Sequence, residues 1–324
     1  MSEIGIIGLG RMGSALACRA LDLGVGVAGT SRSGVPAELR EAGLSPAEDF
    51  AGLLKALDRP RLVLLALPAG PLIDRILGDL HPRLEPGDVI LDGGNSYWGD
   101  GIRRAEGMAE HGLHFLDLGV SGGPEGARHA PCFMIGGSRE AVGTVEPLLQ
   151  RLAGKEGGYV HAGGPGAGHF VKLVHNGIEF GMLQAIGEGL ALLEAHPESL
   201  DIAGTLQVWR RGTVIRSWLV DLMAEAYGDD PDLECPAGIV EDTGEVNWLV
   251  GDAMISETPI PVIAQSVMEL MKSRDRHGVA ARAVTHMRHG FGGHPFGEDP
   301  GVAKERRQGR VGPLYRPSHE EGDP

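Results

Sequence analysis

Residues 8–13 read G-L-G-R-M-G, directly after the apolar run Ile4–Ile7 and directly before a stretch with helical periodicity. A strand, a glycine-rich turn and a helix in this order form the unit that holds the pyrophosphate of a dinucleotide. The first glycine permits a tight turn, the second lets the phosphates approach the backbone, and the third lets the helix pack closely on the strand. We therefore expect a dinucleotide cofactor here, rather than a turn without a ligand. The residues expected to bind it are Gly8, Leu9, Gly10, Arg11, Met12 and Gly13.

Short apolar runs alternate with helical patterns through the first half of the chain. Strands are expected at Ile4–Ile7, Val25–Ala28, Leu62–Leu67, Val89–Leu91, Phe115–Leu118 and Phe133–Ile135. Their nearly continuous apolar character is typical of a parallel sheet buried on both faces. One helix is expected to begin at Ser45, with Pro46 at its first position, and another spans Glu140–Leu152. The pattern predicts an α/β, Rossmann-type doubly wound domain over residues 1–162.

The pattern changes near residue 160, where the sequence Gly163-Gly164-Pro165-Gly166 indicates a loop. A long helical pattern follows at 167–194, and shorter ones follow at Ile202–Trp209, Ser217–Ala226 and Pro261–Arg274. Residues 163–296 are therefore predicted to form an all-α domain. Residues 297–324 are polar and are predicted to be a disordered tail.

Charge and composition argue against several classes of partner. The 324 residues include 29 basic and 44 acidic side chains, a net charge of −15, which disfavours binding to nucleic acid or to an anionic membrane. No apolar run reaches 18 residues, and the chain opens directly into a strand pattern, so we expect no membrane span and no signal peptide. The three cysteines, Cys18, Cys132 and Cys235, are scattered and odd in number, which argues against a disulfide framework. They favour a reducing, cytoplasmic location.

The choice of cofactor depends on the segment after the second predicted strand. An NAD site places an acid there for the ribose 2′-hydroxyl, but residues 29–33 read G-T-S-R-S and contain none. A guanidinium and neighbouring hydroxyls could instead hold a 2′-phosphate. Ser31, Arg32 and Ser33 therefore favour NADP, with NAD as the alternative.

Two glycine-rich loops follow predicted strands and are candidates for substrate contacts. Asp92–Ser96 reads D-G-G-N-S, and Ser121–Pro124 reads S-G-G-P. Loops at the carboxyl ends of such strands line the ligand crevice. Either one could also be an ordinary turn.

A polar stripe lies within the long predicted helix. Lys172, His175, Asn176 and Glu179 have the spacing i, i+3, i+4 and i+7 and therefore share one face. The alternative is a solvated charge ladder. Apolar neighbours argue against it, and so do four glycines that are costly in a helix and imply close backbone approach: Gly166, Gly168, Gly177 and Gly181. A buried lysine can serve as a general base and a nearby glutamate as the acid.

These motifs resemble those of the 6-phosphogluconate dehydrogenases, within the β-hydroxyacid dehydrogenase superfamily. The matching runs are GLGRMG, DGGNS at Asp92–Ser96, SGG at Ser121–Gly123 and GAGHFVKLVHNGIE at Gly166–Glu179. Shorter matches occur at Ile215–Ser217 and Phe291–His294. The resemblance covers about residues 3–296, and the length is similar to the short branch of the family.

The resemblance implies oxidative decarboxylation of 6-phosphogluconate to ribulose 5-phosphate, a step of the pentose phosphate pathway, with no metal. Lys172 would accept the proton of the C3 hydroxyl, and Glu179 would protonate C1 of the enediol left after CO₂ departs. Arg288 and His294 match residues that reach the partner subunit's site, so a homodimer or a dimer of dimers is implied. The residues implied to hold substrate are Asn95, Ser121, Gly122, Gly123, His175, Asn176, Arg216, Arg288 and His294, and Asn95 is also expected at the cofactor.

Two positions depart from the family pattern. Phe180 stands where a tyrosine usually contacts the phosphate, and Asn247 stands where a lysine or arginine usually precedes the tryptophan. A related, unphosphorylated 3-hydroxy sugar acid is therefore an alternative substrate, and a cofactor-binding sensor without turnover is a more distant alternative. His286, His289 and His294 lack a neighbouring carboxylate or cysteine at ligand spacing, so no metal site is expected.

Overall fold

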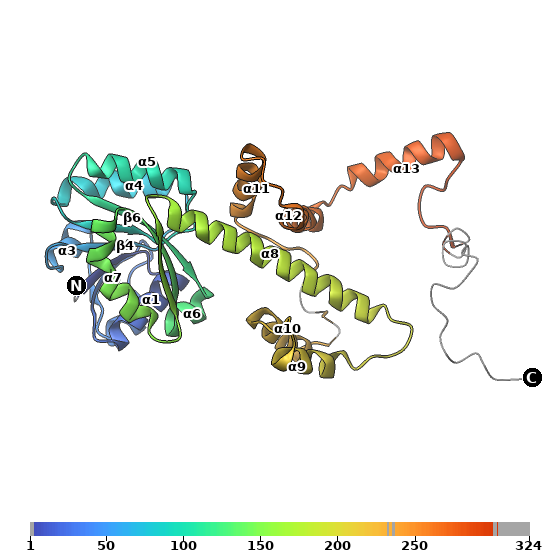
Figure 1. Cartoon of the computed structure of the whole chain (residues 1–324), viewed down its shortest axis with the longest axis horizontal. Coiled ribbons are helices and arrows are strands. Elements are labelled where there is room, and N and C mark those ends of the chain that lie inside the picture. Colours follow the sequence, from blue (N-terminus) through green and yellow to red (C-terminus); the bar gives the residue numbers. More distant parts are fainter. Residues whose placement is uncertain (1–2, 232, 235–236, 301–302, 304–324) are drawn as a thin grey trace, which may run out of the picture. The chain divides into compact units, whose positions relative to one another are not determined.

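The computed structural model describes residues 3–231, 233–234, 237–300 and 303. Within them, eight strands form one sheet with helices packed around it (Figure 1). The strand order is β3-β2-β1-β4-β5-β6-β7-β8. The strands are β1 (Glu3–Ile7), β2 (Gly26–Thr30), β3 (Ser45–Pro46), β4 (Leu62–Leu65), β5 (Val89–Asp92), β6 (His114–Ser121), β7 (Cys132–Gly136) and β8 (Gly158–Gly163). The helices of this region are α1 (Arg11–Asp22), α2 (Ala37–Glu41), α3 (Phe50–Lys55), α4 (Pro71–Leu80), the 3₁₀ turn η1 (His81–Arg83), α5 (Trp98–Ala109), α6 (Gly123–His129) and α7 (Arg139–Ala153).

The sheet is buried on both faces, as predicted. Along β4, Leu62 and Leu64 belong to one apolar cluster, whereas Val63 and Leu65 belong to another. The first cluster includes side chains of α1 and α7, and the second includes side chains of α3 and α4. Because side chains alternate along a strand, helices must cover both sides of the sheet. The prediction of a doubly wound α/β domain is confirmed.

The last two strands, β7 and β8, run antiparallel to the other six strands of the sheet. The pairs from β3 through β6 are parallel, but β7 is antiparallel to β6 and β8 is parallel to β7. The link from β6 to β7 is the short helix α6, which packs on α1. The apolar runs predicted strands β1, β2 and β4–β7, but they missed β3 and β8.

The helix predicted to begin at Ser45 is wrong. Ser45 and Pro46 form the edge strand β3 and pair with Ala28 and Gly29 of β2. Proline is tolerated at an edge because its missing N–H is not needed there. The helix α3 begins later, and its N-cap is Asp49, whose Oδ1 accepts a hydrogen bond from the Gly52 N–H at 2.7 Å.

Beyond the sheet the described chain is helical. The helices are α8 (Ala167–Glu194), α9 (Ile202–Gly212), α10 (Trp218–Asp229), α11 (Glu245–Ile255), α12 (Pro261–Arg274) and α13 (Val279–Gly292). The chain divides into two compact units, residues 1–270 and 271–324, so the division falls within α12. The boundary at residues 162–163 stays a prediction. Most of the predicted tail lies outside the described residues.

Glycines let α8 lie directly against its neighbours. A Cβ at Gly168 would lie 2.5 Å from the carbonyl oxygens of Asp117 in β6 and Met134 in β7. A Cβ at Gly177 would lie 2.5 Å from Leu249 Cδ2 of α11. Gly166, with φ of +86°, begins the helix against the Trp98 carbonyl. The expected close approach is thus confirmed at three positions and is wrong at Gly181, where a Cβ would make ordinary contact at 3.6 Å.

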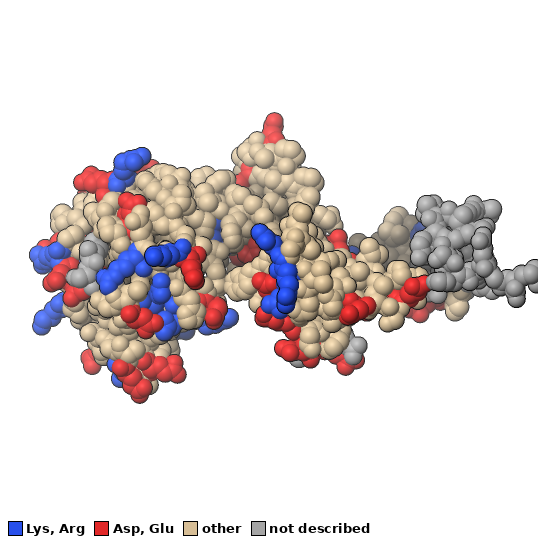
Figure 2. Space-filling view, turned by 60° about the horizontal axis from the view of Figure 1, so that its bottom comes forward, with Lys and Arg blue, Asp and Glu red and all other residues tan. Residues whose placement is uncertain are grey.

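The molecular surface carries charges of both signs. Figure 2 shows basic and acidic side chains interspersed over the sheet domain, and wide uncharged areas over the helical part of the first unit. The helical part exposes several large apolar side chains, among them Ile178, Leu183, Trp218, Met254 and Ile255. In the part of the chain that the structure describes, none of the helices has both the length and the apolar character needed to cross a membrane.

Candidate active site

The glycine-rich turn has the geometry that a pyrophosphate site requires. Gly8 has φ of +97°, and a Cβ there would lie 2.4 Å from the Ala66 carbonyl oxygen. A Cβ at Gly13 would lie 1.9 Å from the Gly8 carbonyl oxygen, whereas a Cβ at Gly10 would meet no protein atom within 4 Å. Gly8 and Gly13 are thus required by protein packing, but Gly10 leaves open space beside the N-terminus of α1. That space and the free N–H groups of the helix fit a dinucleotide phosphate.

The segment predicted to choose the cofactor lies beside this turn. The Gly8 N–H donates to the Thr30 carbonyl oxygen at 2.9 Å, so the end of β2 is adjacent to the glycines. Ser31 Oγ and Ser33 Oγ are 3.4 Å apart. Arg32 is exposed and has no ion pair among the described residues. These three side chains are therefore available to a group attached to the ribose.

One large cleft joins the glycine-rich turn to the polar stripe of α8. It is lined by Gly10–Gly13, by Gly93–Asn95, by Ser121–Gly123 and by the four stripe residues Lys172, His175, Asn176 and Glu179. Its volume of about 1690 Å³ exceeds the usual size of a site for one small ligand, roughly 300–1,000 Å³. The cleft can therefore hold a dinucleotide and a second small molecule together.

Lys172 is the buried cation of this cleft. Its side chain is 8% exposed, and its Nζ donates a hydrogen bond to Asn176 Oδ1. The helix reaches this depth because β6 has a glycine opposite it: a Cβ at Gly119 would lie 2.5 Å from Lys172 Cβ. Burial lowers the pKa of Lys172 below its usual range, and the carboxylates of Glu179 and Glu245 oppose that shift. A lysine in this state can accept a proton.

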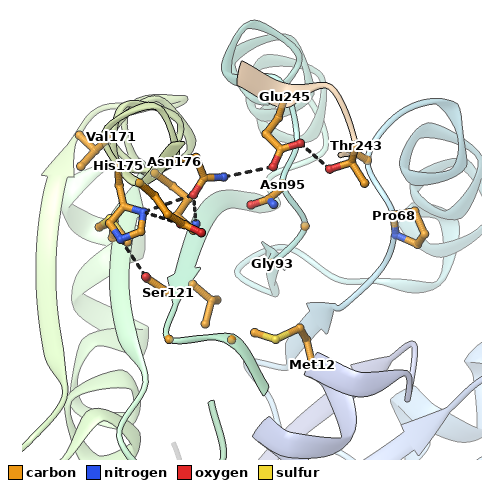
Figure 3. A pocket seen from close by; sticks show the side chains of 18 of the residues that line it. Met12, Pro68, Gly93, Asn95, Ser121, Val171, His175, Asn176, Thr243 and Glu245 are labelled. Atoms are coloured by element: carbon orange, nitrogen blue, oxygen red, sulfur yellow. Dashed lines mark hydrogen bonds and ion pairs between the residues drawn. The ribbon is translucent and has the colours of Figure 1, made fainter. Parts of the chain in front are cut away.

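A continuous chain of hydrogen bonds crosses the cleft (Figure 3). Ser121 Oγ lies 3.0 Å from His175 Nε2, and His175 Nδ1 lies 3.2 Å from Asn176 Oδ1. Asn176 Nδ2 donates to Glu245 Oε1 at 3.3 Å, and Thr243 Oγ1 donates to Glu245 Oε2. Because an amide oxygen only accepts, we assign the neutral His175 proton to Nδ1 and let Nε2 accept from Ser121.

Glu179 lies one turn further along the stripe and is more accessible. Its side chain is 40% exposed, and its Oε2 lies 3.8 Å from His175 Nδ1. It faces the same cleft as Lys172 but has water access. The two groups thus occupy different environments, as an acid and a base with separate roles do.

A buried network supports the loop that carries Asn95. Asp92 is fully buried and accepts hydrogen bonds from the Gly94 N–H at 3.1 Å and from Ser96 Oγ at 2.8 Å. Arg104 lies 3.4 Å from Asp92 and donates from Nε and Nη2 to Asp74, each at 3.0 Å. The Arg104 guanidinium holds the pKa of Asp74 below its usual value. The loop is therefore fixed from beneath, and Asn95 is exposed at the cleft.

The cleft does not include every predicted residue. The lining does not include Gly8, Leu9 or Ser31–Ser33, and Arg216 is exposed outside it. Arg288 belongs to α13 and His294 follows it, both in the second unit. Phe180 lines the cleft, whereas Asn247 is exposed and does not.

Sequence reasoning missed residues that α11 brings to the site. Glu245 and Trp248 line the cleft, and Asp252 accepts hydrogen bonds from Trp98 Nε1 at 2.7 Å and Tyr97 OH at 3.3 Å. Burial and the Asp252 carboxylate raise the pKa of Tyr97. The spacing 245, 248, 252 is one helix face and could have indicated these residues.

Cysteines and histidines form neither a disulfide nor a metal-binding cluster among the described residues. Cys18 and Cys132 are free thiols, and Cys235 lies outside the described range. His289 Nδ1 lies 2.8 Å from the His294 carbonyl oxygen, and His286 and His289 contact the Phe296 ring. No cluster of three histidine, cysteine or acidic side chains there could hold a metal ion.

The fold and the site define the class of protein: an oxidoreductase with a Rossmann domain and a helical domain that supplies a buried lysine. The family model of the NAD-binding domain of 6-phosphogluconate dehydrogenase matches residues 3–163, and that of the C-terminal domain matches residues 168–289. The Bacillus subtilis protein YqeC is 41% identical over 294 residues, 90% of this chain and 98% of its own. The chain belongs to the 6-phosphogluconate dehydrogenase family.

Other relatives extend the comparison. The Haloferax volcanii enzyme named 6-phosphogluconate dehydrogenase, NAD(+)-dependent, decarboxylating, is 38% identical and is covered over 97% of its length, with 90% of this chain aligned. The Plasmodium falciparum 6-phosphogluconate dehydrogenase, solved with NADP⁺ and with 6-phosphogluconate, has a TM-score of 0.76 and 28% identity, covering 92% of this chain and 66% of that one. The chain spans 58–60% of several longer relatives, one of them named NADP(+)-dependent.

Proposed function

We propose that this chain oxidatively decarboxylates 6-phosphogluconate to ribulose 5-phosphate and CO₂, using NADP. The observation that carries the proposal is the buried Lys172 in the same cleft as the glycine-rich turn, with its pKa lowered by burial. A neutral amine beside a dinucleotide site is suited to remove a hydroxyl proton while hydride leaves the same carbon. The names of the relatives supply the substrate.

The residues of the chain would act in sequence. Neutral Lys172 takes the proton of the C3 hydroxyl as the hydride leaves C3. When bound, the nicotinamide supplies the hydride acceptor. Protonated Lys172 then donates a hydrogen bond to the new keto oxygen, which draws the electron pair released as the C1–C2 bond breaks and CO₂ departs.

Glu179 would complete the cycle as the acid. Loss of CO₂ leaves an enediol whose former C2 position becomes C1 of the product and needs a proton. Glu179 faces the cleft with water access, so it can deliver this proton and be protonated again from solvent. Asn95, the Ser121–Gly123 loop, His175 and Asn176 would hold the carboxylate and hydroxyls.

We propose NADP over NAD because of the end of β2. Arg32 is exposed and unpaired among the described residues, and two hydroxyls flank it. A guanidinium can bind a 2′-phosphate through paired hydrogen bonds. This segment has no carboxylate for the 2′-hydroxyl that NAD carries.

The charge of the cleft favours a second candidate, a related sugar acid without phosphate. Among the lining residues, all within the described part of the chain, the basic side chains are Arg11 and Lys172, against the carboxylates Asp100, Glu179 and Glu245. Phe180 adds an apolar ring where the family usually has a phenol. A phosphate would then depend on Arg216, Arg288 and His294, which do not line the cleft as described.

Initial rates of NADPH and NADH formation with 6-phosphogluconate and with gluconate test both candidates. Strong preference for 6-phosphogluconate supports the first, and preference for gluconate supports the second. If the protein turns over neither sugar acid but still binds the cofactor, both candidate functions are refuted, and a cofactor-binding sensor without turnover is the remaining hypothesis. Equal rates with NADP and NAD would contradict the cofactor preference.

We also propose a cytoplasmic homodimer or dimer of dimers. The large apolar side chains exposed on the helical part of the first unit support it, because apolar side chains exposed in number often mark a contact with a partner. In such an assembly Arg288 and His294 would reach the partner's cleft. Light scattering of the purified chain would show a monomer if this proposal is wrong.

A further inference from the structure

Glu245, the first residue of α11, is a second carboxylate at the buried side of the cleft. Its side chain has only 8% exposure, although carboxylates are rarely buried without partners. Both oxygens are engaged: Oε1 accepts from Asn176 Nδ2 at 3.3 Å, and Oε2 accepts from Thr243 Oγ1. The carboxylate is therefore held in one position beside Asn176.

The orientation of the Asn176 amide depends on this carboxylate. An ionised carboxylate can only accept hydrogen bonds, so the amide must turn its NH₂ group towards Glu245. The amide oxygen then points at the Lys172 ammonium, which donates to it, and lies 3.2 Å from His175 Nδ1. The opposite orientation would set donor against donor at Lys172 and acceptor against acceptor at Glu245.

We propose that Glu245 is a positioning residue for the reaction assigned above: it fixes Asn176 so that the amide oxygen holds Lys172, and it supplies the buried negative charge that balances this lysine. The inference rests on the proposed function. Glu245 and Glu179 have different tasks. Glu179 is accessible and can transfer a proton, whereas both oxygens of Glu245 are committed to hydrogen bonds.

The charge of Glu245 has a measurable consequence at Lys172. Among the described residues, the charged or titratable groups around Lys172 are His169, His175 and Glu179 on its own helix and Glu245 from α11. His169 Nε2 lies 3.0 Å from the Asp92 carbonyl oxygen. Ser121 of β6 and Asn95 of the β5 loop are neutral. The carboxylate of Glu245 favours the protonated amine, so it counters the effect of burial on the pKa of Lys172. Removing this charge should therefore lower the pKa of Lys172 further, so that the amine loses its proton at a lower pH than in wild type.

Three substitutions separate the charge from the hydrogen bond. Glu245→Gln keeps an oxygen that can accept from Asn176 but removes the charge. Glu245→Leu removes both the charge and the hydrogen-bond acceptor. Glu245→Asp keeps the charge but shortens the side chain by one methylene, so the carboxylate lies further from Asn176. A matched control is Glu188→Gln, which removes an exposed carboxylate of α8 four turns from Lys172.

The decisive experiment measures Lys172 without turnover. Each purified protein is labelled with trace acetic anhydride across a pH series, and the extent of acetylation of Lys172 is read by mass spectrometry, with the exposed Lys155 as internal reference. In Glu245→Gln, Lys172 should react about threefold faster, or more, at neutral pH, because more of it is neutral. Glu188→Gln should match wild type. Identical profiles for Glu245→Gln and wild type would overturn the charge role.

Kinetics then test the positioning role. The acid limb of kcat/KM should move to lower pH in Glu245→Gln, and kcat at the optimum should be about tenfold lower in Glu245→Leu than in Glu245→Gln, since only the former loses the hydrogen bond. Equal kcat in these two variants would overturn the positioning role. If Glu245→Leu does not fold, Glu245→Asp replaces it. The labelling needs no substrate, so it distinguishes failure of this inference from failure of the proposed function.

Discussion

Replacing Lys172 by methionine is expected to remove activity and to stabilise the fold. Methionine has a similar length and no charge, and the site is 8% exposed. Burial lowers the pKa of Lys172, which means that the folded state holds the lysine proton less tightly than the unfolded state does. The wild-type protein therefore carries a free-energy cost at this position that the variant lacks.

The pH dependence of this effect follows from the direction of the shift. Between the lowered pKa in the folded state and the ordinary value of 10.5, the unfolded chain binds more protons, so wild-type stability rises with pH. Above 10.5 the cost has vanished, and below the folded-state pKa it applies in full. The advantage of Lys172→Met should therefore be greatest at neutral and acidic pH and should shrink towards alkaline pH.

The structure also sets the size of the effect. Replacing a whole buried ion pair by apolar groups typically stabilises by about 1–4 kcal/mol. Lys172→Met removes only the cation, leaves the Glu245 carboxylate in place and loses the hydrogen bond to Asn176, which costs about 1 kcal/mol. Because the net shift of the Lys172 pKa is downward, we still expect a gain, but only of about 1 kcal/mol near neutral pH. Loss of the general base should lower kcat by about 10²–10⁴.

Urea unfolding at several pH values, together with turnover of 6-phosphogluconate, measures both effects. Lys155→Met is the control, because Lys155 is exposed and its replacement should change neither quantity. A variant that is less stable than wild type at neutral pH while it keeps full turnover would refute the reasoning. Lys172 would then be neither strained by burial nor the base.

Three other substitutions have defined outcomes. Gly119→Ala places a Cβ 2.5 Å from Lys172 Cβ, so we expect it to lose about 1–3 kcal/mol of stability in thermal unfolding and most of its turnover. Gly107→Ala is the control, because its Cβ would meet nothing within 4 Å, and it should keep both stability and turnover. Asp252→Ala removes the acceptor of two aromatic donors and should cost about 1–3 kcal/mol in urea unfolding, and no loss would show that α11 is held by packing alone. Arg32→Ser should lower kcat/KM for NADP by about 10- to 100-fold and leave that for NAD unchanged, and a parallel loss with both cofactors would contradict a role at the 2′-phosphate.

Features that depend on neighbouring residues could be predicted from the sequence. The spans of α8 and α12 agree with their periodicity, and the glycine turn has the packing that its pattern requires. Lys172 and Asn176 share a face because helix geometry alone places them there. Their burial was indicated by the glycines of α8, which are poor helix formers unless another backbone or side chain lies against them.

Features that depend on distant contacts could not be predicted in this way. Ser45 and Pro46 resemble a helix start locally, but pairing with β2 places them in a strand. Glu245 is 69 residues from Asn176, and no spacing rule relates the two. Tertiary packing brings α11 to the stripe: Leu249 lies against Gly177, and Val246 shares an apolar cluster with Leu173. The shared helix face of Lys172 and Asn176 can thus be predicted from the sequence, whereas the distant carboxylate beside them cannot.

The proposed base and the proposed phosphorylated substrate make opposite demands on the charge of this cleft. Burial against Gly119 and Gly168 weakens the hold of Lys172 on its proton, and Glu245 restores part of it. The same carboxylate, with Glu179 and Asp100, gives the described lining three acidic side chains against two basic ones, Arg11 and Lys172 itself. A phosphorylated sugar acid brings further negative charge, so its binding requires cations from outside this lining. Arg216 in the first unit and Arg288 in the second are the candidates named by the family pattern. The dependence of KM on these two arginines therefore decides between the phosphorylated and the unphosphorylated substrate, independently of how well Lys172 serves as base.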